Sequence, residues 1–279
     1  MILLTGANGQ LGTDFQKIFQ KEKIDFIATD YDTLDITNKE SIVNFFENKN
    51  IDIIINCAAY NNVDKAEEES EICYKLNSEA PLLLAQAARQ INAIFMTYST
   101  DFVFDGKKGK PYSEDDEPRP LSVYGKSKRE GELAVMNAFS KVFIVRTSWV
   151  FGIGNNNFVK QVVEWAQKNS VLKIVDDQIS APTYSYDLAL YSWKLLLSKQ
   201  YGVYHLSNTG IASKFDQVKY VLEKINWKGS LMPAKTQDFN LKAQRPVFSK
   251  LDSSLLEEKI KEKIPTWQSG INRFFEEWR

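Results

Sequence analysis

Residues 2–12 read ILLTGANGQLG, an apolar run followed by glycines at every third position. The run is typical of a buried strand, and apolar residues at helical spacing from Leu11 to Phe19 indicate that a helix follows. Glycines in such a strand-to-helix turn permit a tight bend, close backbone approach to a pyrophosphate and close helix packing, while the helix N-terminus offers free N–H groups. We therefore expect a dinucleotide-binding turn made by Gly6, Asn8, Gly9, Gln10, Leu11 and Gly12.

An acidic residue follows at the distance that this interpretation requires. The next apolar run, Ile24–Thr29, predicts a second strand that ends at Asp30, about 20 residues after the turn. A carboxylate there accepts hydrogen bonds from the adenosine ribose and repels a 2′-phosphate. We expect Asp30 and Asp35 at the cofactor, which is NADH or NADPH, with NADH serving at least as well as NADPH.

Strand and helix patterns alternate through the first half of the chain, which favours an α/β fold with a doubly wound parallel (Rossmann) sheet. Further strands are predicted at residues 51–56, 94–98 and 142–146, and helices at 64–76, 82–90 and 125–136. Thr37–Glu40 predicts a capping box before another helix. The long polar stretch from Gly106 to Pro120 is expected to form a rim or lid.

The pattern loosens after Phe151. Helices are predicted at 157–168, 187–197 and 215–224, short strands at 172–175 and 203–206, and a helix at the end of the chain. We expect a dinucleotide-binding domain over residues 1–150. Residues 151–279 would form a smaller, mainly substrate-binding α/β region at the carboxyl edge of the sheet, with segments returning to the first domain.

Composition favours small ligands as partners. With 43% hydrophobic and 25% charged residues and a net charge of −1, the chain gives no electrostatic reason to expect nucleic acid or a membrane. Two cysteines and one histidine are too few for a disulfide framework or a zinc site. No leader or spanning segment is recognised, so the expected location is the cytoplasm. A homodimer is left open.

Residues that follow the predicted strands are the candidates for chemistry, because ligands of such sheets bind at the carboxyl ends of strands. Small residues in Cys57–Tyr60 would let a nicotinamide ring lie close to the backbone, although helix packing explains them equally well. Hydroxyls follow in Ser99-Thr100. Tyr124 and Lys128 are four residues apart, on one face of a predicted helix. A lysine beside a tyrosine lowers the pKa of the phenol and suits it to proton transfer.

Other motifs are weaker. Tyr220 and Lys224 repeat the Tyr–Lys spacing on a helix far from the glycine turn, and we interpret that pair as structural. His205 alternates along a short predicted strand and is also interpreted as structural. The acidic run Glu114–Glu117 could attract Mg²⁺, but such runs are usually solvated loops, so no metal is assigned.

Together these features resemble the extended short-chain dehydrogenase/reductase superfamily and, within it, the dTDP-4-dehydrorhamnose reductase family. The matching sequence motifs are spread over nearly the whole chain. They are the glycine turn, Ala58-Ala59, Val63–Glu67, Ser99–Phe104, Tyr124–Lys128, Arg146–Phe151, Asp177–Thr183 and Arg245-Pro246. The resemblance implies NAD(P)H-dependent reduction of the 4-keto group of a dTDP-4-keto-6-deoxysugar, with dTDP-4-dehydrorhamnose converted to dTDP-L-rhamnose.

The resemblance also implies individual roles. Thr100 would orient the keto oxygen, Tyr124 would donate the proton, and Lys128 would tune Tyr124 and hold the nicotinamide ribose. Ala58, Ala59 and Tyr60 would line the cofactor. The substrate would meet Asn61, Val63, Thr100, Asp101, Trp149 and Arg245. Asn61 replaces the hydroxyl residue expected at that position, and a core tryptophan is the alternative interpretation of Trp149.

Two other functions remain open at this point. The same fold and tyrosine serve sugar-nucleotide epimerases and dehydratases, in which the cofactor is regenerated on the enzyme. A non-catalytic subunit like the regulatory subunit of methionine adenosyltransferase is a further alternative, although such relatives lose the tyrosine that this chain retains as Tyr124.

Overall fold

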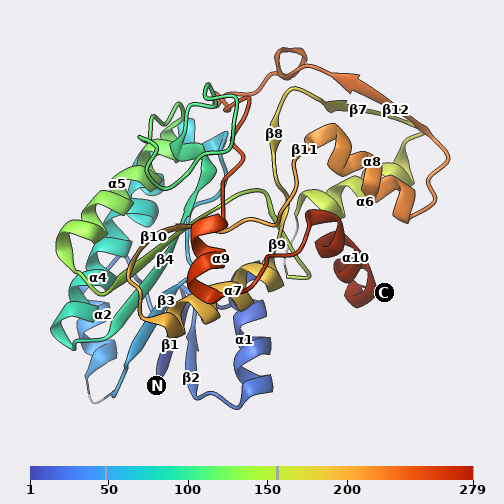
Figure 1. Ribbon diagram of the computed structural model, residues 1–279. Coiled ribbons are helices and arrows are strands. Elements are labelled where there is room, and N and C mark those ends of the chain that lie inside the picture. The colour runs from blue at the N-terminus through green and yellow to red at the C-terminus, as the bar shows by residue number, and fades with distance from the viewer. Residues whose placement is uncertain (48, 155–156, 279) are drawn as a thin grey trace.

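The computed structural model describes residues 1–47, 49–154 and 157–278, and its centre is a six-stranded sheet whose neighbouring strands are all parallel (Figure 1). From one edge to the other the strands are β10 (Gly202–His205), β5 (Val142–Thr147), β4 (Ile94–Thr100), β3 (Ile53–Asn56), β1 (Ile2–Thr5) and β2 (Phe26–Thr29). The predicted doubly wound α/β class is confirmed.

The direction of strand addition reverses between β1 and β3. From β1 the chain moves outward to β2, then crosses to the other side of β1 to form β3, β4 and β5. Ligands of open parallel sheets bind beside such a reversal, at the carboxyl ends of the strands. The glycine turn follows β1 and therefore lies at this place.

Helices cover both faces of the sheet because side chains alternate along each strand. Leu4 faces a core with Phe15 and Phe19 of α1 (Gln10–Glu22) and Leu195 of α7 (Ser185–Ser198). Its neighbour Leu3 faces the opposite core. Three helices supply that second core, namely α2 (Lys39–Phe46), α4 (Ala80–Gln90) and α5 (Val123–Ala138).

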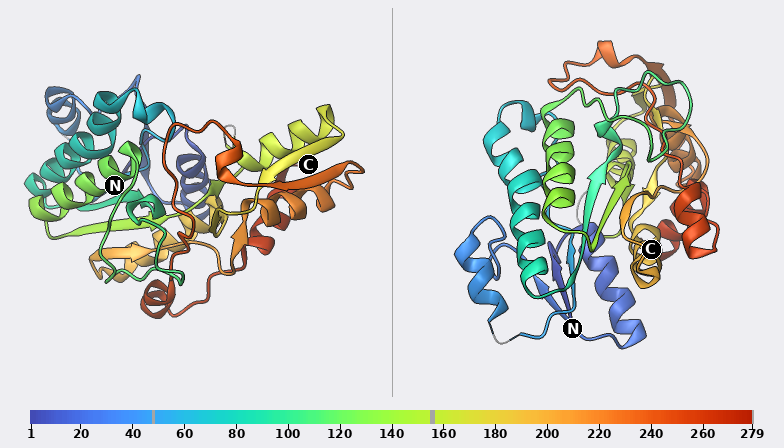
Figure 2. Two further views of the ribbon diagram at one scale, coloured as in Figure 1. Left: turned by 90° about the horizontal axis from the view of Figure 1, so that it is seen from above. Right: turned by 60° about the vertical axis from the view of Figure 1, so that its left-hand side comes forward.

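The C-terminal region lies beside the sheet and has its own core (Figure 2). Its helices are α6 (Phe158–Lys168), α8 (Lys214–Lys224) and α10 (Trp267–Trp278). Its strands pair as β7 (Val171–Val175) with β12 (Ser230–Ala234), β8 (Ile179–Ser180) with β11 (Ala212–Ser213), and β6 (Val150–Phe151) with β9 (Thr183–Tyr184). Helix α9 (Ser254–Ile260) packs against α7. The division at residue 150 stays a prediction, and both β10 and α7 come from beyond it.

The predicted capping box at Thr37 is wrong. Asn38 is the N-cap of α2, and its side-chain oxygen accepts from the backbone N–H groups of Glu40 and Ser41 at 2.9 and 3.1 Å. The Thr37 hydroxyl donates instead to Asp35 at 2.7 Å. An asparagine directly before the first helical residue supplies the same cap one position later.

The predicted helix over residues 64–76 is also different. The chain forms a 3₁₀ turn (Lys65–Glu67), breaks, and then continues from α3 (Ser70–Tyr74) through a π segment (Lys75–Glu79) directly into α4. The Asp64 carboxylate accepts hydrogen bonds from Arg245 and from the Ala243 N–H, which fixes this turn by contacts distant in sequence. Pro81 lies in the first turn of α4, as predicted, because its missing N–H is tolerated there, although α4 follows the π segment without a break.

Within the described ranges, none of the helices is both long enough and apolar enough to span a bilayer.

Candidate active site

Two adjoining clefts open at the carboxyl ends of the strands. The β1–β3 cleft, of about 600 Å³, is lined by the turns after β1, β2 and β3 and by the helical segment around Lys75. The β4–β5 cleft, of about 500 Å³, is lined by the ends of β4 and β5 and by the start of α5. Gly9, Cys57, Ala59 and Asn61 line both clefts, so one elongated ligand or two ligands in contact can occupy them.

The glycine turn is built for close packing. Gly6 has φ of +65°, and a Cβ there would lie 2.5 Å from the Ala58 nitrogen. A Cβ on Gly12 would lie 2.4 Å from the Gly6 carbonyl oxygen. Gly9 is the N-cap of α1 and has no side chain to satisfy the first N–H groups of the helix. Asn8 lines the β1–β3 cleft, and Gln10 and Leu11 line the β4–β5 cleft.

Two carboxylates lie in the β1–β3 cleft. Asp30 accepts from the Asn8 N–H at 2.9 Å and from the Tyr31 N–H at 2.8 Å, which fixes its side chain beside the glycine turn. Asp35 lines the same cleft and accepts from Thr37. The turn after β3 adds Ala58 and Ala59. The close packing of the backbone at the glycine turn and the fixed carboxylate of Asp30 fit the requirements of a dinucleotide site.

Tyr60 turns away from both clefts. Its hydroxyl donates to Glu69 at 2.6 Å, and its backbone N–H donates to Asn77 at 2.9 Å. The backbone of Tyr60 therefore continues the turn after β3, while its side chain packs near Tyr124. Among the described residues that line the two clefts, Tyr60 is absent.

Thr100 and Tyr124 meet in the β4–β5 cleft. Thr100 is the last residue of β4, and Tyr124 is in the first turn of α5, which Ser122 caps by accepting from the Gly125 N–H. A Cβ on Gly125 would lie 2.3 Å from the Phe102 carbonyl oxygen, so glycine lets α5 approach the strand end. Both residues line this cleft, and the Thr100 hydroxyl acts to lower the pKa of the Tyr124 phenol.

Lys128 lies on the same face of α5 as Tyr124. Its ammonium donates to the Tyr98 carbonyl at 3.2 Å, and burial lowers its pKa to about 8. Burial raises the pKa of Tyr124 above its usual range, and the Thr100 hydroxyl only partly opposes this. In the protein without ligands, burial therefore outweighs the lowering of the Tyr124 pKa that the Tyr–Lys spacing suggests.

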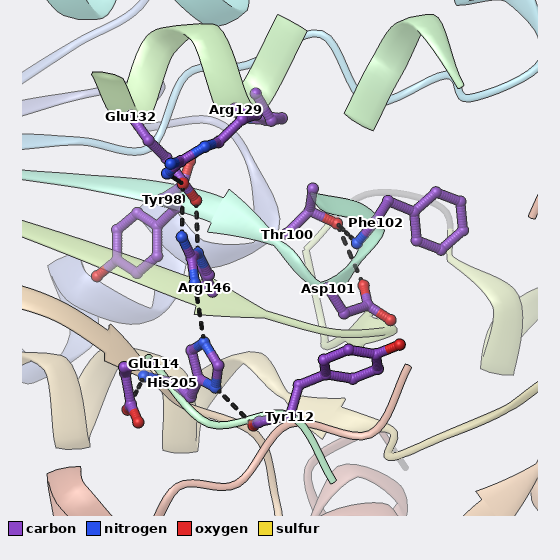
Figure 3. Close-up of polar contacts among 11 residues, drawn as sticks. Tyr98, Thr100, Asp101, Phe102, Tyr112, Glu114, Arg129, Glu132, Arg146 and His205 are labelled. Atoms are coloured by element: carbon purple, nitrogen blue, oxygen red, sulfur yellow. Dashed lines mark hydrogen bonds and ion pairs between the residues drawn. The ribbon is translucent and has the colours of Figure 1, made fainter. Parts of the chain in front are cut away.

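A buried polar network joins α5 to β5 and was not predicted from the sequence (Figure 3). Glu132 accepts from Arg146 at 2.7 and 2.8 Å and from Arg129 at 2.8 Å. Against the effect of burial, Arg146 holds the pKa of Glu132 below its usual range. Although Glu132 is four residues after Lys128, its carboxylate pairs with the two arginines, so the Lys128 ammonium remains directed to the end of β4.

His205 extends this network to the polar loop. Its ring lies 3.3 Å from an Arg146 nitrogen and 3.0 Å from the Tyr112 carbonyl, and its backbone N–H donates to Glu114 at 2.8 Å (Figure 3). Burial, assisted by Arg146, lowers the pKa of His205 to about 3, so the ring is neutral. It lines neither cleft, and it ties the segment at Tyr112 to the sheet.

Trp149 lines the β4–β5 cleft together with Asn61 and Val63. Its φ is +45°, a left-handed conformation that costs a non-glycine residue of order 1 kcal/mol. The Lys214 ammonium lies 3.7 Å from the centroid of the Trp149 ring, and burial lowers the Lys214 pKa to about 7. Sequence reasoning missed Lys214, because no local pattern brings it to Trp149.

Arg245 is paired within the protein. Its guanidinium donates to both oxygens of Asp64 at 3.0 and 2.6 Å and to the Ala243 carbonyl. Arg245 is not among the described residues that line the two clefts. Its pairing with Asp64 holds the segment around Arg245 against the loop that follows β3.

The weaker motifs lie elsewhere. The Tyr220 hydroxyl donates to Asn272, far from the clefts in the C-terminal core. In the acidic run, Glu114 accepts from His205, Asp116 pairs with Lys108, and Glu117 pairs with Arg119. Among residues 1–47, 49–154 and 157–278, no group of three acidic, cysteine or histidine side chains could hold a metal ion.

Comparison with known proteins gives matches along the full chain. The family model described as RmlD substrate binding domain matches residues 1–279. The dTDP-4-dehydrorhamnose reductase of Aggregatibacter actinomycetemcomitans is 36% identical over 97% of this chain and 96% of its own. The spore coat polysaccharide biosynthesis protein SpsK of Bacillus subtilis is 34% identical over 99% of this chain and 97% of its own. The crystal structure of dTDP-4-dehydrorhamnose reductase from Bacillus anthracis in complex with NADP matches with a TM-score of 0.96 and 38% identity, over 99% of this chain and 98% of that chain.

Proposed function

The chain belongs to the RmlD substrate-binding-domain family, and we propose that it reduces the 4-keto group of a dTDP-4-keto-6-deoxysugar with NADPH or NADH. The observation that carries this function is that Thr100, Tyr124 and Lys128 line one cleft, which adjoins the cleft of the glycine turn. The β1–β3 cleft suits a dinucleotide, and in the adjoining β4–β5 cleft Tyr124 could donate a proton to a substrate carbonyl.

The positions of the residues support the following roles. A reduced nicotinamide cofactor, when bound, supplies the hydride to the carbonyl carbon. Gly6, Gly9 and Gly12 would bring the backbone close to its phosphates, and Asp30 would accept from its adenosine ribose. Tyr124 donates its phenolic proton to the carbonyl oxygen as negative charge develops there. The Lys128 ammonium, held at the end of β4, stabilises the resulting phenolate.

Trp149, Asn61 and Val63 would contact the sugar. The apolar face of an indole suits the C–H and methyl surface of a deoxysugar. From the names of the relatives we take dTDP-4-dehydrorhamnose as the substrate and dTDP-L-rhamnose as the product. Cys57 and Cys73 are free thiols, and on this ground we propose a cytoplasmic location for the reaction.

The test is to incubate the protein with NADPH or NADH and freshly generated 4-keto-6-deoxysugar nucleotides, and to identify the product by NMR. Stoichiometric loss of the reduced cofactor with formation of a 4-hydroxy sugar supports a reductase. Interconversion of sugars without net cofactor consumption would indicate an epimerase instead. Binding of both ligands with no turnover would indicate a non-catalytic subunit.

A further inference from the structure

Asp101 directly follows Thr100 and is almost completely buried, with 2% of its surface exposed. The Thr100 hydroxyl donates to its Oδ1 atom at 3.2 Å (Figure 3). Its Oδ2 atom accepts from Ser180 of β8 at 3.3 Å and from Ser249. Three hydroxyl groups from three parts of the chain therefore surround this carboxylate.

The Thr100 hydroxyl has no further hydrogen to offer. Its oxygen accepts from the Phe102 N–H at 3.2 Å, while its single proton lies toward Asp101. A hydroxyl has one donor and two acceptor sites, so these two contacts leave one lone pair and no hydrogen. While Asp101 is ionised, Thr100 therefore presents a lone pair, and not a hydrogen, to the site of the substrate oxygen.

A carbonyl oxygen bound between Thr100 and Tyr124 needs donors. We propose that Asp101 is a positioning residue that is protonated in the productive complex and donates its own O–H to Thr100, which turns the Thr100 hydrogen toward the substrate carbonyl. The proton comes from solvent when the substrate binds and returns to solvent when the product leaves. Only O–H bonds form and break in this step. The proposal rests on the reductase function above.

The surroundings of Asp101 make a proton available near neutral pH. Burial raises the pKa of its carboxyl to about 6, against the hydrogen bonds from Ser249, Thr100 and Ser180 and the charge of Lys214. Three titratable groups interact with the charge of Asp101: Tyr124 on α5, Lys214 on α8, and Lys250, which follows Ser249. Holding a protonated Asp101 at pH 7 therefore needs only a modest contribution from the substrate.

The main test is the pH dependence of kcat/KM between pH 6 and 8. If the substrate binds only to the form with protonated Asp101, kcat/KM of the natural protein falls about tenfold per pH unit above about 7. In Asp101→Asn the amide N–H donates to Thr100 at every pH, so this decline is expected to disappear. Ser249→Ala removes a hydrogen bond that favours the ionised carboxylate, so its decline is expected to start at higher pH.

Two results would overturn the proposal. If Asp101→Asn keeps the decline of the natural protein, the titration belongs to Lys128, Lys214 or Lys250. If Asp101→Asn loses as much activity as Thr100→Ala at every pH, the carboxylate acts in its ionised form or only in folding. Absence of turnover by the natural protein with every keto-sugar nucleotide and both cofactors would instead refute the proposed function, and this proposal with it.

Thermal unfolding without substrate gives an independent readout. The folded state holds the Asp101 proton to higher pH than the unfolded chain does, so ionisation destabilises the fold as pH rises from about 4 to about 6. The Tm of Asp101→Asn relative to the natural protein should therefore rise over this interval and then level off. A Tm difference that is constant with pH would contradict a titrating Asp101.

Discussion

The β1–β3 cleft and the β4–β5 cleft adjoin but are made in different ways. The first is shaped by backbone: glycines whose missing side chains leave room, helix N–H groups, and carboxylates fixed by neighbouring amides. The second is shaped by side chains that distant segments hold in place, such as Asp101 by Ser249 and Trp149 by Lys214. A site for a common cofactor can thus be encoded locally, whereas a site for one substrate is assembled from the whole chain.

The largest effect is expected from Tyr124→Phe, which breaks the chemistry of the β4–β5 cleft alone. The ring keeps its packing against Phe102, but the proton donor is lost, so kcat should fall by about 10²–10⁴ with cofactor affinity unchanged. Steady-state rates and NADPH titration measure the two effects. Tyr220→Phe is the matched control and should be nearly silent. Retention of more than a tenth of the activity by Tyr124→Phe would remove Tyr124 from the chemistry.

Trp149→Ala tests whether the Trp149 side of the β4–β5 cleft binds the sugar. Loss of the indole face should misplace the substrate and lower kcat/KM on the order of 10²-fold, while cofactor binding survives. The measurements are reductase rates, NADPH affinity and thermal unfolding of the same preparation. If stability and cofactor binding fall together, Trp149 is a core residue.

Gly12→Ala tests the backbone-built cleft. The added Cβ would lie 2.4 Å from the Gly6 carbonyl, and relief of such a clash costs about 1–3 kcal/mol. We expect cofactor affinity to fall about tenfold or more, as isothermal titration would measure. Gly109→Ala is the control: unlike Gly12, Gly109 has a positive φ, but its Cβ would meet nothing within 4 Å, so cofactor affinity should not change. Equal affinities of both variants would show that α1 moves freely at the turn.

The smallest expected effect concerns cofactor choice. Asp30 presents a fixed carboxylate to the β1–β3 cleft, and a 2′-phosphate there meets repulsion. Asp30→Ala should therefore shift the ratio of kcat/KM for NADPH and NADH several-fold toward NADPH, with kcat on NADPH little changed. A natural protein that prefers NADPH tenfold would mean that a cation reaches the 2′-phosphate despite Asp30.

Local patterns predicted most of the fold, because strand and helix periodicity survive in the core. Ile2–Thr5, the α1 face and the carboxyl-end residues all follow from neighbours in sequence. Helix starts were less certain: Thr37 and Asn38 are both good caps, and only packing decides between them. The break near Glu69 depends on Arg245, which lies far along the chain and pairs with Asp64.

The candidate site divides in the same way. The glycine turn and the Tyr124–Lys128 spacing are local signals, so the sequence contains them. The hydroxyl groups of Ser180 and Ser249 around Asp101, and the ammonium of Lys214 over Trp149, have no signal near the residues they hold. The Lys128–Glu132 spacing even suggests an ion pair, but a better partner for Glu132, Arg146, comes from β5.

Strand β10 closes the outer edge of the sheet, although it follows β5 only after α6 and α7. During synthesis on the ribosome, β5 emerges first, and all six of its residues are buried in the finished protein. Until β10 is synthesised, the unpaired backbone groups of β5 can form hydrogen bonds with another nascent chain. A product truncated before Gly202 keeps the buried strand β5 at the edge of the sheet, so its release carries a risk of aggregation that β10 lowers by covering this strand.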